Sequence, residues 1–140
     1  MKRINKILPH AMEALNASGL IIGGTSILKE YDGYVASFAP SVITAGLKAT
    51  LSFYTDNHKE RSPKRGDILK VLLTIYQQLD TPIAGNDLLG IALARNRTEG
   101  EIRQLKRDLM DCSIALKLCL RNFKQVESVQ PEPLTQPAEL

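Results

Sequence analysis

The sequence has little of the chemistry from which metal sites and disulfide frameworks are built. Its 140 residues include two cysteines, two histidines and no tryptophan. Cys112 and Cys119 are seven positions apart in a helical pattern, which separates them by about 10.5 Å along the axis, too far for a disulfide. Two thiols with His10 and His58 elsewhere also make a poor metal site. We expect no metal, and we interpret both cysteines as small core residues.

Long apolar runs are also missing. GLIIGG at 19–24 is too short to cross a bilayer. Glu13 and Asn16 interrupt the apolar stretch that a signal peptide needs near the N-terminus. Hydrophobic residues make up 44% of the chain and charged residues 24%, which is typical of a folded globular protein. We therefore expect a soluble, cytoplasmic protein without membrane contact.

Motifs for catalysis are missing as well. Neither histidine lies in a pattern that would mark a Ser/His/Asp or Cys/His arrangement. SGLIIGGTS at 18–26 contains three glycines, but it matches neither the dinucleotide fingerprint nor the P-loop. The carboxylates are scattered rather than paired. We predict a non-enzyme that has no catalytic residues and no cofactor.

The sequence does have apolar residues at helical spacing along nearly its whole length, and no stretch alternates convincingly with period two. Pro40 predicts a helix boundary or kink. Gly46 is expected either inside a closely packed helix or at a break before Leu47. The predicted helices are 4–19, a segment capped by Thr25 or Ser26 that ends near Ala39, 41–54, a segment capped by Asp67 that ends near Leu79, 88–94 and 98–124.

The last of these helices has the clearest pattern. Thr98 and Glu101 form a capping box. After Lys124 the sequence contains three prolines and few core residues, which is typical of a disordered tail. We predict an all-α fold, a compact bundle of about six helices that forms a single domain over residues 1–125, followed by a flexible, Pro-containing tail over residues 126–140. The apolar stripe of the last helix comprises Ile102, Leu105, Leu109, Cys112, Leu116, Cys119 and Phe123.

Basic residues gather in two places. The formal net charge is +3, but residues 1–125 carry 18 basic and 12 acidic side chains, a balance of +6. A single-sign face suits phosphate binding, because each neutralised phosphate releases counterions, and a solvated outer face is the alternative. The first group is the loop HKERSPKRG at 58–66, with Lys59, Arg61, Lys64 and Arg65. The second group is the last helix and its entry, where Arg95 and Arg97 precede the helix. Its six helical members fall within about a 100° arc opposite the apolar stripe, and they are Arg103, Lys106, Arg107, Lys117, Arg121 and Lys124.

An apolar ridge interrupts this second basic group. Met110, Ile114 and Leu118 recur every four residues within the same arc. A purely solvated face would not normally carry such a ridge. Either the helix is central and buried on two sides, or the ridge contacts another subunit. Both alternatives fit a component of a larger assembly.

The segment YDGYVASFAPSVITAGLKATLSFYTDN at 31–57 resembles the signature region of the small helical subunit of type III-B (Cmr) CRISPR effector complexes. The family's later basic and apolar helix is matched loosely by residues 95–124. The absence of tryptophan and the acidic, Pro-containing tail depart from the family pattern. The matching features are Tyr31 and Tyr34, the Ala39–Pro40 break, Val42–Ile43, Gly46–Leu47 and Phe53–Tyr54.

This resemblance implies an all-helical, non-catalytic subunit that stacks in several copies as a minor filament and helps hold target RNA against the guide RNA in antiviral defence. Its implied partners are the other Cmr effector subunits, including the backbone subunits, further copies of itself, and guide and target RNA. Met110, Ile114 and Leu118 are the candidate subunit contacts. The candidate RNA contacts are Lys48, Lys59, Arg61, Lys64, Arg65, Arg103, Lys106 and Arg107.

Two other interpretations stay open. NDLLGIALARNRTEGEIRQLKRDLM at 86–110 can form a DNA-binding helix-turn-helix, with Arg103, Lys106 and Arg107 facing the groove. Against this interpretation, no tight glycine turn joins the two helices, and the second helix continues far beyond the motif. The third interpretation is a purely structural helical interaction protein that makes no nucleic acid contact.

Overall fold

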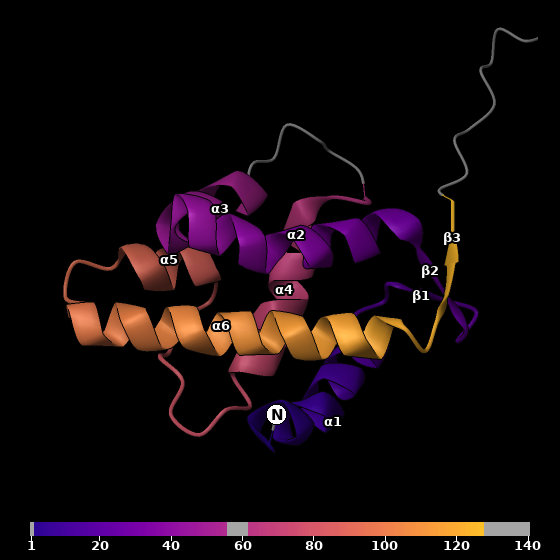
Figure 1. Ribbon diagram of the computed structural model, residues 1–140, viewed down its shortest axis with the longest axis horizontal. Coiled ribbons are helices and arrows are strands. Elements are labelled where there is room, and N and C mark those ends of the chain that lie inside the picture. The colour runs from indigo at the N-terminus through magenta and orange to yellow at the C-terminus, as the bar shows by residue number, and fades with distance from the viewer. Residues whose placement is uncertain (1, 56–61, 128–140) are drawn as a thin grey trace, which may run out of the picture.

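The computed structural model describes residues 2–55 and 62–127, which fold into six helices and three short strands (Figure 1). The predicted all-α bundle is confirmed, and a small sheet accompanies it. The predicted tail lies outside the described residues from position 128 on. Within the described ranges, no helix has the length and apolar character needed to span a membrane. The elements are α1 (Lys2–Ala17), β1 (Ile21–Ile22), β2 (Ser26–Leu28), α2 (Lys29–Ala45), α3 (Leu47–Thr55), α4 (Arg65–Tyr76), α5 (Leu88–Leu93), α6 (Glu99–Leu120) and β3 (Lys124–Val126).

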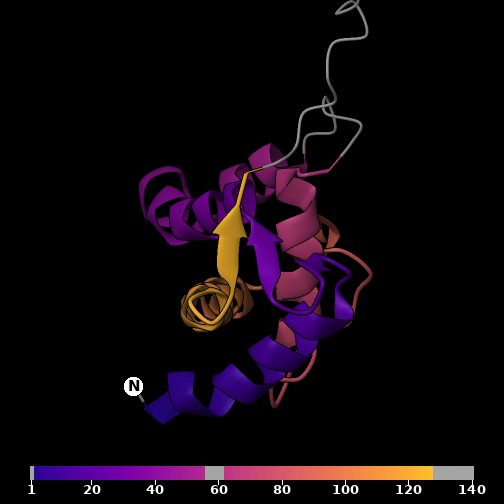
Figure 2. The ribbon, with the colours of Figure 1, turned by 90° about the vertical axis from the view of Figure 1, so that its right-hand side faces the viewer.

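The central helix is α6, which contacts α1, α2 and α4 and is viewed end-on in Figure 2. Its predicted capping box is confirmed, because the Thr98 hydroxyl accepts from the Glu101 N–H at 3.1 Å and the Glu101 carboxylate accepts from the Thr98 N–H at 2.9 Å. The helix ends at Leu120, so Phe123 and Lys124, which the sequence places on it, lie beyond its end. The fully buried part of the predicted stripe comprises Leu105, Leu109, Cys112, Leu116 and Cys119.

Both cysteines are free thiols in this buried stripe, as predicted. Burial raises the pKa of Cys112 to about 12 and also raises the pKa of Cys119. A thiol with a raised pKa stays protonated at neutral pH and is a poor nucleophile. The cysteines therefore act as core residues of α6.

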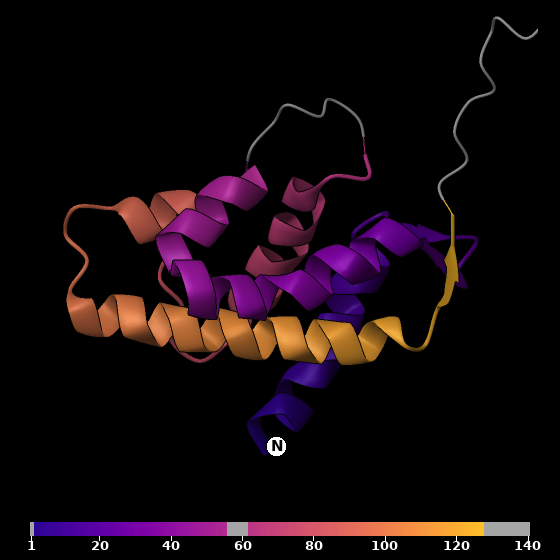
Figure 3. The same cartoon turned by 45° about the horizontal axis from the view of Figure 1, so that its top comes forward.

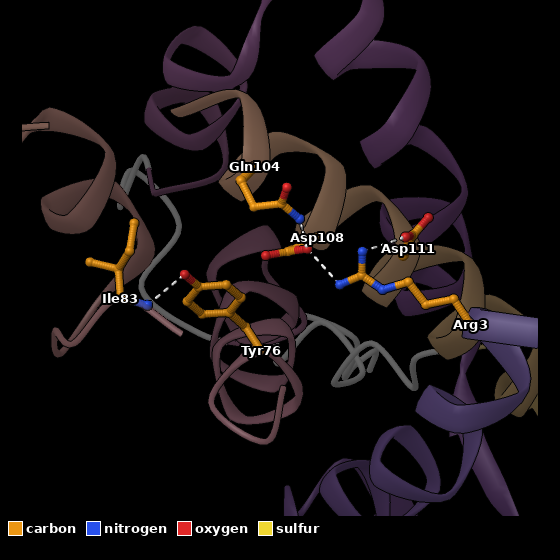
Figure 4. A network of polar contacts seen from close by, with 6 residues as sticks. All are labelled: Arg3, Tyr76, Ile83, Gln104, Asp108 and Asp111. Carbon is orange, nitrogen blue, oxygen red and sulfur yellow. Dashed lines mark hydrogen bonds and ion pairs between the residues drawn. The ribbon is translucent and has the colours of Figure 1, made fainter. Parts of the chain in front are cut away.

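A polar network joins α1 to α6 (Figure 4). The Arg3 guanidinium contacts the Asp108 carboxylate at 2.5 Å and the Asp111 carboxylate at 3.3 Å. Gln104 donates a second hydrogen bond to Asp108 at 2.8 Å. The hydrogen bond to Asp108 raises the pKa of Arg3. Since Asp108 is buried, these partners replace the water that its charge loses on folding.

The helix boundary expected at Pro40 does not form, because α2 continues through this residue to Ala45. Pro40 is exposed, so water can reach the carbonyl that lacks a helical N–H partner. Buried Phe38 and Val42 on either side hold the helix against the core. The break comes at Gly46, whose φ of +93° lies in the region that favours glycine. Figure 3 shows the resulting change of direction between α2 and α3, which confirms the alternative of a break before the third helix.

Two predicted helix caps are wrong. Ser26 lies in β2 and Thr25 in the turn before it, so neither caps α2, which begins at Lys29. Asp67 is the third residue of α4 rather than its cap. Its carboxylate instead accepts a hydrogen bond from the backbone N–H of Lys64, the residue at the cap position, at 3.1 Å.

The sequence did not predict the three-stranded sheet. β1 and β2 form an antiparallel hairpin with Ile21 opposite Ile27. Gly23 and Gly24 at its tip have φ values of +60° and +77°, which suit a tight hairpin turn. The strands are two or three residues long, too short to show alternation in the sequence.

The third strand comes from the other end of the chain. β3 pairs in parallel with β2, with Ser26 opposite Lys124, so residues almost a hundred positions apart lie side by side. β3 extends to Val126. The domain boundary expected after residue 125 therefore falls inside this strand, and Val126 belongs to the folded domain.

Candidate nucleic-acid interface

The candidate RNA contacts lie on separate parts of the molecule. Lys64 and Arg65 lie at the start of α4. Figure 1 shows α4 beside α2. Lys48 is exposed on α3. Lys59, Arg61 and the neighbouring His58 lie outside the described residues. Arg103, Lys106 and Arg107 lie on the first half of α6, where the two arginines are exposed and the lysine is half-buried.

A groove of about 620 Å³ opens between α2, α3 and the start of α4. Its walls include Tyr34, Ser37 and Ser41 of α2, Phe53 of α3 and Arg65 of α4. They also include two carboxylates, Glu30 and Glu127, and Lys29, whose ammonium lies 3.7 Å from the Glu127 carboxylate. Among the described candidates, Arg65 is the one that lines this groove. Arg65, from the predicted basic group, therefore lines a concave surface that also contains aromatic side chains and hydroxyl groups.

The Arg65 guanidinium lies over two aromatic rings. Its central carbon is 5.1 Å from the ring centroid of Tyr34 and 4.4 Å from that of Phe53, both within the range of cation–π attraction. No carboxylate in the described part of the chain pairs with this guanidinium. The Phe53 side chain is 54% exposed. A full positive charge and an aromatic surface are thus presented together to solvent.

Few aromatic residues exist in this chain, and most of them support the groove. Five of the seven lie between positions 31 and 54. Tyr54 packs edge-on against Phe53, with centroids 6.1 Å apart, and against Phe38, with centroids 5.5 Å apart. Its hydroxyl donates to the Tyr34 backbone carbonyl at 2.6 Å, which fastens α3 to α2. Burial raises the pKa of Tyr54, so this hydroxyl keeps its proton.

A buried carboxylate fixes the start of α4 relative to α2. Asp67 accepts hydrogen bonds from the Tyr31 hydroxyl and the Ser62 hydroxyl, both at 2.6 Å, and from the Lys64 N–H. Burial alone would raise the pKa of Asp67, but the hydrogen bonds from Ser62 and Tyr31 outweigh it and lower this pKa. Burial, with the hydrogen bond to Asp67, raises the pKa of Tyr31. The network holds Arg65 close to the α2 rings.

The expected single basic arc on the last helix is wrong for two of its six members, and a third is paired within the molecule. Arg121 lies past the end of α6, and Lys124 lies in β3. The Lys117 ammonium contacts the Asp32 carboxylate of α2 at 2.6 Å, so its charge is used inside the molecule. Arg103 also has an acidic neighbour, Glu99, at 4.0 Å.

The apolar ridge on α6 is also explained in part by the fold. Met110 and Leu118 are half-buried and pack against the core. These two residues agree with the alternative of a central helix that is buried on two sides. Ile114 is 40% exposed. Figure 2 shows α6 with one side open, away from α4. Ile114 is the member of this ridge that stays most accessible to another subunit.

Sequence reasoning missed two features of the charged surface. Tyr34 and Phe53 were matched to a family signature without a binding role, although the concentration of aromatics before a basic loop was a usable signal. Lys2, Lys6 and His10 line a second hollow of about 550 Å³ along α1. Their spacing of four residues places them on one side of that helix.

No cluster of three His, Cys, Asp or Glu side chains that could hold a metal ion occurs in the described ranges. Comparisons with protein-family models, curated proteins and solved structures found no match to this chain.

Proposed function

We propose that this chain is a non-catalytic, RNA-binding small subunit of a type III-B (Cmr) CRISPR effector complex. In this role it stacks with further copies of itself as a minor filament beside the backbone subunits, and it helps hold target RNA against the guide RNA. The family assignment rests on the resemblance of residues 31–57. The RNA contact rests on the groove at Arg65.

One observation carries the RNA-binding part of the proposal. The Arg65 guanidinium lies over Tyr34 and Phe53 without a carboxylate partner in the described part of the chain, and the Phe53 ring is half exposed. Proteins that hold single-stranded RNA combine basic groups for the phosphates with aromatic faces for the bases. A solvated basic loop without aromatic neighbours would favour RNA much less.

The assembly is tested by affinity purification of the tagged chain from its native host. We expect the other effector subunits and short guide RNAs to co-purify. The family assignment fails if neither is recovered from cells that express the complex. Sequence-specific binding of duplex DNA by the isolated chain would instead favour the helix-turn-helix interpretation.

The location of the RNA contact is tested by charge reversal in the assembled complex. Changing Lys59, Arg61, Lys64 and Arg65 together to Glu should abolish most of the target RNA affinity. Changing Arg103, Lys106 and Arg107 together to Glu is the matched control and should have the smaller effect. Target binding that survives the first set of changes contradicts the assignment of the Arg65 region.

A further inference from the structure

We propose that the groove at Arg65 binds one unstacked nucleotide of single-stranded RNA, with the base against the Phe53 ring and the phosphate on the Arg65 guanidinium. This inference rests on the proposed RNA-binding function and names the chemical unit that the groove takes. It also assigns Phe53 and Tyr34 a direct role that neither basic charge nor the resemblance gives them.

The groove has the size and polarity that a nucleotide needs. Its volume of about 620 Å³ is within the range of small-ligand sites. The Ser37 hydroxyl donates to the Gly33 carbonyl at 2.8 Å, which leaves its oxygen free to accept from a base edge. The Ser41 and Thr50 hydroxyls share one hydrogen bond at 2.8 Å, so this pair keeps further capacity toward the groove. An aromatic floor with hydroxyl groups at its side matches the flat, polar-edged shape of a base.

The Arg65 guanidinium occupies the position over the rings that the base takes on binding. It is planar and lies over the same rings on which a base would stack. Base–aromatic stacking stabilises more than a cation–π contact at an exposed site. A phosphate also offers the guanidinium charge-assisted hydrogen bonds, which the rings cannot. The guanidinium therefore moves to the phosphate while the base takes its position on the rings.

The same geometry selects the strand type and not the sequence. A base in a duplex has both faces covered by its neighbours, so the Phe53 ring can stack only on a base that has left the stack. Every base has a π face, and stacking of this kind tolerates all four. The groove is thus suited to a strand that must be held regardless of its sequence.

The test uses the full chain and two probes, a single-stranded uridine hexanucleotide and an abasic hexanucleotide with the same phosphates. Phe53→Ala should weaken binding of the uridine probe about tenfold, the loss expected for one stacked base, and leave the abasic probe unaffected. Leu93→Ala is the matched control, because Leu93 is 53% exposed against 54% for Phe53 and does not line the groove. It should change neither affinity. Arg65→Gln should weaken both probes, since both carry phosphates.

Three results would overturn the inference. The first is equal affinity of the unaltered chain for the two probes. The second is the absence of any binding of the uridine probe. The third is an equal loss of affinity for both probes in Phe53→Ala. Thermal unfolding of each variant shows that the fold is kept. Base-dependent binding without co-purifying effector subunits would leave the groove assigned and remove only the assembly role. Co-purification without base-dependent binding would keep the assembly role and remove the groove assignment.

Discussion

The two basic regions of this protein look alike in sequence and differ in their surroundings. At the start of α4, Arg65 lies over two aromatic rings beside a groove. On the first half of α6, Arg103 is exposed beside an acidic neighbour, and Lys117 further along the helix is engaged by Asp32. Equal charge thus lies beside an aromatic groove in one region and is exposed or paired within the molecule in the other.

The difference follows from what lies beneath each region. Under Arg65, the chain concentrates its aromatic residues and fastens them with the hydroxyls of Tyr31 and Tyr54. Under the basic side of α6 lies an apolar stripe that is used for packing, and Arg103 and Arg107 on the outer side are exposed. A basic group gains a binding function where a concave, partly apolar surface adjoins it.

The largest expected effect falls on α6, the helix that carries the second basic region. Leu109→Ala should lower the free energy of unfolding by about 2–5 kcal/mol, because Leu109 is fully buried at the centre of α6 and its truncation leaves a cavity. Ile114→Ala, on the open side of the same helix, should cost less than about 1 kcal/mol. Chemical denaturation measures both. Similar losses in the two variants would contradict the placement of α6 at the centre.

A smaller loss of stability is expected from a change at Asp67, which fixes the start of α4 beside the groove. Asp67→Asn should lower the free energy of unfolding by about 1–2 kcal/mol, because the carboxylate accepts three hydrogen bonds. The folded state lowers the pKa of Asp67 below its ordinary value of 3.8, so this stabilisation is present above that pH and is lost as the pH falls below it.

Thermal unfolding measured between neutral and strongly acidic pH checks this sign. The Asn variant should lose less stability than the unaltered chain on acidification. Asp80→Asn is the control, because Asp80 is exposed and the hydrogen bonds from Tyr31, Ser62 and Lys64 go to Asp67 instead. A Tyr31→Phe variant removes one donor to Asp67 and should show part of the same effect.

The comparison between the two arginine groups can be sharpened without changing charge. Arg65→Lys keeps the cation but replaces a planar group by a compact ammonium, which stacks and binds phosphate less well. We expect about a fivefold loss of affinity for single-stranded RNA, corresponding to about 1 kcal/mol. Arg107→Lys should have no measurable effect. Equal losses measured by fluorescence anisotropy would mean that the groove has no special role.

The smallest effect is expected for the ion pair between Lys117 and Asp32, which engages the Lys117 charge within the molecule. The Lys117–Asp32 contact is partly exposed, so a double-mutant cycle with Lys117→Met and Asp32→Asn should give a coupling of about 0.5–1 kcal/mol in stability. Lys117→Met should leave RNA affinity unchanged. A loss of RNA affinity without loss of stability would add Lys117 to the candidate contacts.

Local patterns were sufficient for the presence of the helices but not for all of their ends, because the boundary expected at Pro40 did not form and α2 continues to Ala45. Five of the seven residues predicted for the α6 stripe are buried, its capping box was predicted correctly, and both buried cysteines followed from the same spacing. The caps proposed at Thr25, Ser26 and Asp67 were wrong, because the same residue types also suit strands, turns and the first turn of a helix. The end of α6 was misplaced because Phe123 and Lys124 continue the helical spacing past the last helical residue.

By itself, the sequence determined that this chain is helical, that it has a moderately basic folded part and that its cysteines are core residues, since these properties depend on composition and on spacing within a few turns. The tertiary structure decided the rest. It paired β3 with β2 across the length of the chain and engaged Lys117 with Asp32. It also placed Arg65 over Tyr34 and Phe53, and contacts between residues so far apart depend on how helices pack.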